Sequence, residues 1–226
     1  MSGCPNLKEL RLSFVTFTYQ EFHSLISNFP LLEVLDLDTC ELERITISSN
    51  ILKCLSINYC YKLKAIDIDT PNLVSFIYKR NQIPEFSINA PCPWYVEFAN
   101  KKAKDSPGYE IIFDLDTSWF LKMKGFLEES NQIEFLTLKI WSAKNSFSFE
   151  EFIQSSASLP CKVGTLYLQI DEPQSNYEAM LDGVFAICNP RILSIMKREK
   201  YDNNFIEWLF EKLINKDSNC CESLHV

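Results

Sequence analysis

Glycine is scarce in this sequence, with only five among 226 residues. Propeller blades and phosphate-binding loops depend on glycine, because their backbones turn sharply or approach a ligand closely. The scarcity therefore argues against a propeller and against a glycine-rich phosphate-binding protein. No Walker, Rossmann or nucleophile-elbow motif occurs in the sequence either.

Histidine is scarcer still, since His23 and His225 are the only two. His23 lies beside the apolar stripe of a predicted helix, so we expect a surface or capping residue rather than a base. No Cys-x-x-Cys spacing occurs, and adjacent cysteines such as Cys220 and Cys221 rarely share one zinc ion. We therefore expect no enzyme activity, no catalytic residue, no metal site and no cofactor.

Positive charge is also in short supply, because 22 Lys and Arg face 30 Asp and Glu, for a formal net charge of −8. This balance argues against a nucleic-acid partner, which needs clustered basic side chains. No apolar run is long enough for a membrane span, and no signal region begins the sequence. The nine cysteines are an odd number and are interpreted as reduced thiols, which predicts a cytoplasmic or nuclear protein.

A threefold repetition runs from Phe29 to Asn89. The three units share one pattern: Leu32-x-x-Leu35-x-Leu37-x-x-Cys40, Leu52-x-x-Leu55-x-Ile57-x-x-Cys60 and Leu73-x-x-Phe76-x-Tyr78-x-x-Asn81. Their first leucines lie 20 and 21 residues apart. Several constraints recur together at one period, which is the leucine-rich-repeat pattern.

The spacing has a simple physical meaning. The last two apolar residues of L-x-x-L-x-L are two apart, so they point to one face of a short strand. A single unit cannot cover that face, whereas stacked units bury it in one continuous core. The predicted buried residues are Leu35, Leu37, Leu55, Ile57, Phe76 and Tyr78. The predicted fold is an α/β leucine-rich-repeat solenoid, with a curved parallel sheet on the concave side and helices and turns outside.

The organisation predicted for the chain is a single solenoid over residues 1–216, followed by a polar tail over residues 217–226. Short repeats occupy residues 4–90, an irregular unit residues 91–132, and long repeats residues 133–216. Each short unit closes with a second apolar alternation, such as Ile45-Thr46-Ile47, but leaves room outside for only a turn or one helical turn. Helices are predicted after Thr18-x-x-Glu21, from about Thr117, after Ser148-x-x-Glu151, after Ser175-x-x-Glu178 and after Asp202.

Several segments carry a resemblance to a known family. They are Cys4-Pro-Asn-Leu-Lys-Glu-Leu-Arg-Leu, Phe29-Pro-Leu-Leu-Glu-Val-Leu-Asp-Leu, Pro71-Asn-Leu-Val-Ser-Phe and Phe205-Ile-Glu-Trp-Leu-Phe-Glu-Lys-Leu. From Cys4 to about Cys221, the chain resembles the repeat region of the plant F-box/leucine-rich-repeat proteins. Its first repeat starts at residue 4, so we expect no F-box within the chain.

The resemblance implies a function. In that family an F-box docks onto the Skp-type adaptor of a cullin (SCF-type) ubiquitin ligase, and the repeats recognise a protein substrate. A Skp-type adaptor is therefore expected as a partner only if a longer product carries an F-box. The alternative is the repeat region of another intracellular plant receptor, an immune or hormone sensor, with a small ligand on the concave wall.

The side chains beside the buried strand positions are expected to face the concave wall and to form the binding surface. These candidates are Arg11, Val34, Asp36, Asp38, Ser56, Asn58, Ile77, Lys79, Phe135, Thr137, Lys139, Tyr167 and Gln169. A solvated sheet face needs no Phe135 or Tyr167, so these resemble anchors of an interface. The other interpretation is that long neighbouring side chains simply cover these groups.

Overall fold

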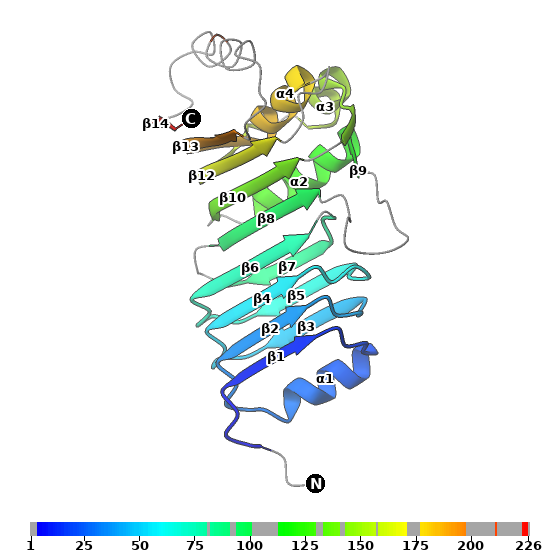
Figure 1. Ribbon diagram of the computed structural model, residues 1–226, viewed down its shortest axis with the longest axis vertical. Helices are drawn as coiled ribbons and strands as arrows, with labels where there is room; N and C mark the ends of the chain where they lie inside the picture. Colours follow the sequence, from blue (N-terminus) through cyan, green and yellow to red (C-terminus); the bar gives the residue numbers. More distant parts are fainter. Residues whose placement is uncertain are drawn as a thin grey trace. The chain divides into compact units, whose positions relative to one another are not determined.

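The computed structural model describes residues 4–80, 82–90, 94–100, 113–129, 133–140, 143–156, 158–170, 177–197, 211 and 223–225 (Figure 1). The chain forms two compact units, Met1–Glu97 and Phe98–Val226. Parallel strands follow the predicted repeats in both units. The predicted leucine-rich-repeat solenoid fold is thus confirmed.

The first sheet of unit 1 takes one strand from each repeat. In order across the sheet these strands are β1 (Glu9–Ser13), β2 (Val34–Asp38), β4 (Cys54–Asn58) and β6 (Ser75–Arg80), with β8 (Trp94–Asn100) next in order. The pairs β1–β2, β2–β4 and β4–β6 are parallel, and Leu35 lies opposite Leu55, which lies opposite Phe76. Equivalent repeat positions therefore stack directly on one another.

A second parallel sheet forms the other wall of unit 1, where the sequence suggests only turns. Its strands are β3 (Arg44–Ser48), β5 (Ala65–Asp69) and β7 (Glu85–Asn89). Figure 1 shows this sheet behind the first one. The reason is the closing alternation of each short unit, because Ile45 lies opposite Ile66, which lies opposite Phe86. Two apolar residues two apart suffice for a strand once neighbours supply the same pattern.

The core of unit 1 lies between the two sheets. All six residues predicted to be buried are at most 1 % exposed, which confirms the register: Leu35, Leu37, Leu55, Ile57, Phe76 and Tyr78. The ring of Tyr78 on β6 meets Phe86 on β7 edge to face, with 5.3 Å between the ring centroids. This contact joins the two sheets across the core.

The helix predicted in the first repeat is present as α1 (Tyr19–Ser27). The Thr18 hydroxyl accepts from the backbone N–H of Glu21, and the Glu21 carboxylate accepts from the backbone N–H of Thr18. This reciprocal capping satisfies two backbone donors at the start of the helix. Phe22 is fully buried, and α1 packs against β3.

Unit 2 is built from longer repeats with helices between the strands. Its main strands are β10 (Ile133–Ile140), β12 (Cys161–Ile170), β13 (Cys188–Lys197) and β14 (Ser223–His225), paired in that order and all parallel. Its helices are α2 (Thr117–Glu129), α3 (Phe149–Ser155) and α4 (Tyr177–Ile187). A separate parallel pair joins β9 (Phe113–Asp116) and β11 (Ala143–Ser146).

Three of the predicted helices of unit 2 fall on described residues, and these occur where expected as α2, α3 and α4. Helical spacing places five apolar residues on one side of α2, and all five are buried: Trp119, Phe120, Met123, Phe126 and Leu127. Gly183 lets α4 approach this helix, because a Cβ at that position would lie 2.7 Å from the ring of Phe120. Ser148 caps α3 by accepting from the backbone N–H of Glu151 at 3.3 Å.

Two boundaries in unit 2 differ from the prediction. The pattern Ile192-x-x-Ile195 predicts that the last long strand begins at Ile192. Strand β13 begins at Cys188 instead, so Pro190 lies within it, opposite Val163. Within the predicted polar tail, β14 pairs with β13, because an exposed strand edge accepts backbone partners whatever their side chains. The capping box at Ser175, the helix predicted after Asp202 and Asn81 of the repeat pattern lie outside the described residues.

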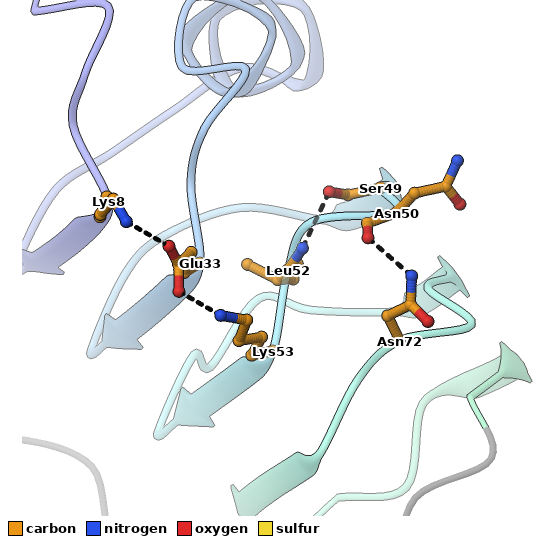
Figure 2. Close-up of polar contacts among 7 residues, drawn as sticks. All are labelled: Lys8, Glu33, Ser49, Asn50, Leu52, Lys53 and Asn72. Carbon is orange, nitrogen blue, oxygen red and sulfur yellow. Dashed lines mark hydrogen bonds and ion pairs between the residues drawn. The ribbon is translucent and has the colours of Figure 1, made fainter.

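A charged row crosses the starts of the strands in unit 1 (Figure 2). Lys8 directly precedes β1, Glu33 directly precedes β2, and Lys53 directly precedes β4. Lys8 Nζ lies 2.8 Å from one carboxylate oxygen of Glu33, and Lys53 Nζ lies 2.5 Å from the other. Hydrogen bonds from Lys53 and then Lys8 lower the pKa of Glu33 from 4.5 to about 2.

The turns that lead from a strand of the second sheet to the next strand of the first sheet are also joined by hydrogen bonds (Figure 2). Asn72 donates its amide to the Asn50 carbonyl oxygen at 2.8 Å, across 22 residues of sequence. The Ser49 hydroxyl accepts from the backbone N–H of Leu52 at 3.1 Å. These contacts satisfy turn groups that the two sheets leave unpaired.

Truncation of one stacked leucine tests the register. Leu55→Ala should lower the free energy of unfolding by about 2–5 kcal/mol, because it leaves a cavity between two fully packed neighbours. Ser48→Ala, on the exposed end of β3, should change it by less than about 0.5 kcal/mol. The measurement is urea unfolding of the full chain. A loss for Leu55→Ala below about 1 kcal/mol would contradict the stacked register.

The Lys8–Glu33–Lys53 row predicts a pH-dependent stability. The folded-state pKa of Glu33 is depressed, so its stabilising effect is full above about pH 4.5 and is lost as pH falls toward 2. Glu33→Gln should therefore lower the melting temperature by a few degrees at pH 7 and by progressively less below pH 4.5.

The matched control for this test is Glu43→Gln, because Glu43 pairs with a single lysine, Lys64. Its effect at pH 7 should be smaller than that of Glu33→Gln. An equal loss of melting temperature for Glu33→Gln at pH 7 and pH 3 would show that the carboxylate charge is not what stabilises the row.

Candidate binding face

The open face of unit 1 is the side of its first sheet opposite the buried leucines. Strand alternation places all eight candidates of unit 1 on it: Arg11, Val34, Asp36, Asp38, Ser56, Asn58, Ile77 and Lys79. Arg11 is exposed and the other seven are half-buried. The register forms rows across the sheet, so that Asp38, Asn58 and Lys79 lie side by side.

Asn58 organises the centre of this face. Its amide nitrogen donates to Asp36 Oδ1 at 3.2 Å and to the Ser56 hydroxyl at 2.8 Å. The amide oxygen of Asn58 is buried and has no hydrogen-bond partner among the described residues. The amide orientation is therefore set by its two donor contacts, which hold Asp36 and Ser56 in place.

The charges on this face are unevenly neutralised. Arg11 pairs with Glu9 on the same strand at 2.5 Å. Asp36 and Asp38 form no ion pair with a lysine or arginine in the described part of the chain, and neither does Lys79. The centre of the face thus presents two uncompensated carboxylates, with one ammonium two strands from Asp38.

Three residues just beyond the carboxyl ends of the strands have left-handed backbone conformations. The φ angles are 58° for Phe14, 52° for Thr39 and 53° for Tyr59. Each follows β1, β2 or β4 and donates its backbone N–H to a carbonyl oxygen of the next strand, that of Asp38, Asn58 or Lys79, at 3.0, 2.8 and 2.8 Å. Sequence inspection misses these turns, because none of the three is the glycine or asparagine that usually occupies such a position.

Just beyond the same strand ends, buried side chains donate hydrogen bonds to the backbone. The Cys40 thiol donates to the Leu12 carbonyl oxygen at 3.4 Å, and the Cys60 thiol donates to the Asn58 carbonyl oxygen at 3.6 Å. Burial raises the pKa of Cys40, and raises that of Cys60 to about 12. Both thiols are thus protonated at neutral pH and can act as hydrogen-bond donors.

In the next repeat the buried hydrogen-bond donor is Arg80 instead of a cysteine. Strand β6 is one residue longer than β4, and Arg80 is only 3 % exposed. Its guanidinium donates to the Leu63 carbonyl oxygen at 2.6 Å and also to the carbonyl oxygen of Tyr61. An arginine on a short strand is not recognisable as buried from sequence, because arginine usually lies at the surface.

Unit 2 has its own open face, and all five remaining candidates lie on it: Phe135, Thr137, Lys139, Tyr167 and Gln169. The rings of Phe135 and Tyr167 are stacked, with centroids 6.0 Å apart and planes 21° apart. Both side chains are half-buried.

Two further apolar residues on β13 extend this surface. Ile192 lies opposite Thr165, and Met196 lies opposite Gln169 and is 53 % exposed. Sequence analysis does not include them, although the same alternation along Ile192-x-x-Ile195 could have identified them. The open face of unit 2 therefore carries four large apolar or aromatic side chains, Phe135, Tyr167, Ile192 and Met196, among polar ones, in contrast to the charged face of unit 1.

The described residues contain no group of three or more His, Cys, Asp or Glu side chains that could hold a metal ion. Among the described helices, none is long and apolar enough to cross a membrane.

Comparison with known proteins agrees with the repeat architecture. Residues 1–98 match the family model described as "At1g61320/AtMIF1, LRR domain", and this stretch nearly coincides with unit 1. No curated protein and no solved structure matches the chain. Residues 1–98 are therefore similar to the leucine-rich-repeat domain of a plant protein.

Proposed function

We propose that this chain recognises a protein substrate for an F-box receptor of a cullin (SCF-type) ubiquitin ligase. The substrate binds to the open faces of the two units. The repeat architecture supports a protein-binding domain, since parallel repeats present long rows of side chains to a partner. The resemblance to plant F-box/leucine-rich-repeat proteins supports the connection to ubiquitin ligation.

The observation that carries the binding role is the Phe135–Tyr167 stack on the open face of unit 2. Two aromatic rings on a sheet face offer a large contact area with little side-chain entropy to lose. Aromatic residues that form a rigid centre among polar neighbours are typical anchors of protein interfaces. Thr137, Lys139 and Gln169 supply such a polar surround on the same two strands.

The ligase connection depends on a second protein. A Skp-type adaptor would join only through an F-box in a longer product, and the chain would then act in the cytoplasm or nucleus by binding rather than by catalysis. Co-purification of a Skp-type adaptor with the full gene product tests this connection. Binding of a plant hormone or another small ligand to the same faces, with no adaptor present, would instead favour the receptor alternative.

Truncation of the two stacked rings tests the binding role. Phe135→Ala and Tyr167→Ala should each weaken binding of the protein partner about tenfold or more, because anchor residues dominate interface energies. Neither variant should lower the melting temperature by more than a few degrees, since both rings lie outside the core. Affinity purification with quantitative mass spectrometry identifies the partner as the protein lost from both variants.

Phe149→Ala is the matched control, because Phe149 is an aromatic residue on α3 that is 49 % exposed. This variant should retain the partner at the level of the unmodified chain. Retention by Phe135→Ala and Tyr167→Ala together with loss by Phe149→Ala would place the interface on the helices and contradict the proposal.

A further inference from the structure

We propose that the open face of unit 1 binds a positively charged segment of the partner protein. An arginine or lysine of that segment would lie between the Asp36/Asp38 carboxylates and the ring of Tyr59. The inference rests on the proposed protein-binding function and adds the chemistry of the partner at this face.

The first argument is charge complementarity. Each lysine and arginine described in unit 1, apart from Lys79 and Arg80, pairs with a carboxylate away from the centre of the open face. Arg80 is buried and donates to backbone carbonyl oxygens and to Gln82. Asp36 and Asp38 are half-buried carboxylates that form no ion pair with any lysine or arginine whose position the structure describes. A cation from a partner could therefore pair with these two carboxylates without displacing a described lysine or arginine of unit 1.

The second argument is an aromatic residue that follows the row of Asp38 and Asn58 directly, because Tyr59 is next to Asn58, which lies opposite Asp38. Tyr59 is half-buried at the carboxyl end of β4, and Tyr61, two residues later, is 51 % exposed. Burial is the main cause that raises the pKa of Tyr59, and the nearby charges of Glu97 and Asp38 add to it. A ring in a negative environment attracts a guanidinium or ammonium group through its π face. Carboxylate and ring together thus select a basic side chain over a neutral one.

Lys79 sets a limit on this site. It lies in the same row as Asp38, with Asn58 between them. Its ammonium group repels a bound cation and reduces the attraction of the two carboxylates. Removal of this charge should therefore tighten binding, which is an effect opposite to that of a general loss of structure.

The test uses the full chain and a set of fluorescein-labelled Gly/Ser peptides of about a dozen residues at about 0.15 M salt. One peptide carries three arginines, and in the others glutamine or glutamate replaces them. Fluorescence anisotropy should show binding of the arginine peptide and at least about tenfold weaker binding of the glutamine peptide. The glutamate peptide should not bind.

Four variants locate the site. Asp38→Asn should weaken binding of the arginine peptide about fivefold to tenfold, and Lys79→Gln should tighten it severalfold. Asp69→Asn, the same charge change on the outer strand β5, should alter it less than about twofold. Tyr59→Asn should weaken binding without loss of melting temperature, because asparagine tolerates the left-handed backbone that Tyr59 occupies.

Two results would overturn the inference. One is equal binding of the arginine and glutamine peptides, or no binding of either. The other is equal weakening by Asp38→Asn and Asp69→Asn, which would show attraction to the net charge of −8 rather than to this face. Either result leaves the proposed function intact if Phe135→Ala still loses the protein partner, so the two failures are distinguishable.

Discussion

In-register stacking of equivalent repeat positions is the constraint on which the rest of this structure depends. One strand of five residues can bury two apolar side chains only if neighbouring strands place the same positions beside them. Leu35, Leu55 and Phe76 satisfy this requirement across three strands. The same register then fixes every other row, including the charged row at the strand starts and the side chains of the open face.

The carboxyl ends of the strands show how local chemistry varies within this constraint. Two repeats place a cysteine thiol inside and a left-handed residue before it, whereas the next repeat extends its strand and turns Arg80 inward. All three side chains donate hydrogen bonds to backbone carbonyl oxygens. At these left-handed turns Phe14 is 79 % exposed, and Thr39 and Tyr59 are half-buried. The same turns therefore position both the buried hydrogen-bond donors inside the unit and the neighbouring side chains that a partner could contact.

Much of the fold follows from the sequence, because period and alternation are local signals. The buried strand residues, the capping box at Thr18 and helices α2 to α4 are all recognisable from spacing. The second sheet is not, because each of its strands offers only two apolar side chains and becomes a strand through its neighbours. The β14 strand escapes prediction for a related reason, since Ser223–His225 pairs through its backbone.

The sequence predicts which residues lie on the open faces, but not which contacts their side chains make. Alternation alone places Asp36 and Phe135 on exposed sheet faces. It does not show that Phe135 stacks on Tyr167, because that contact is diagonal between two strands. Nor does it show that Asp36 and Asp38 lack a cationic partner among the described residues, because ion pairs depend on side-chain reach across repeats. The left-handed conformation of Tyr59 is equally hidden, since a tyrosine rarely adopts it.

The central claim is that the open sheet faces contact a protein partner. Photo-crosslinking tests it most directly, with a photoreactive phenylalanine analogue in place of Tyr167 in one sample of the full chain and in place of Phe149 in another. The account predicts that light links a protein partner to position 167 and leaves position 149 unlinked. Crosslinking of that partner from position 149 but not from position 167 would contradict it.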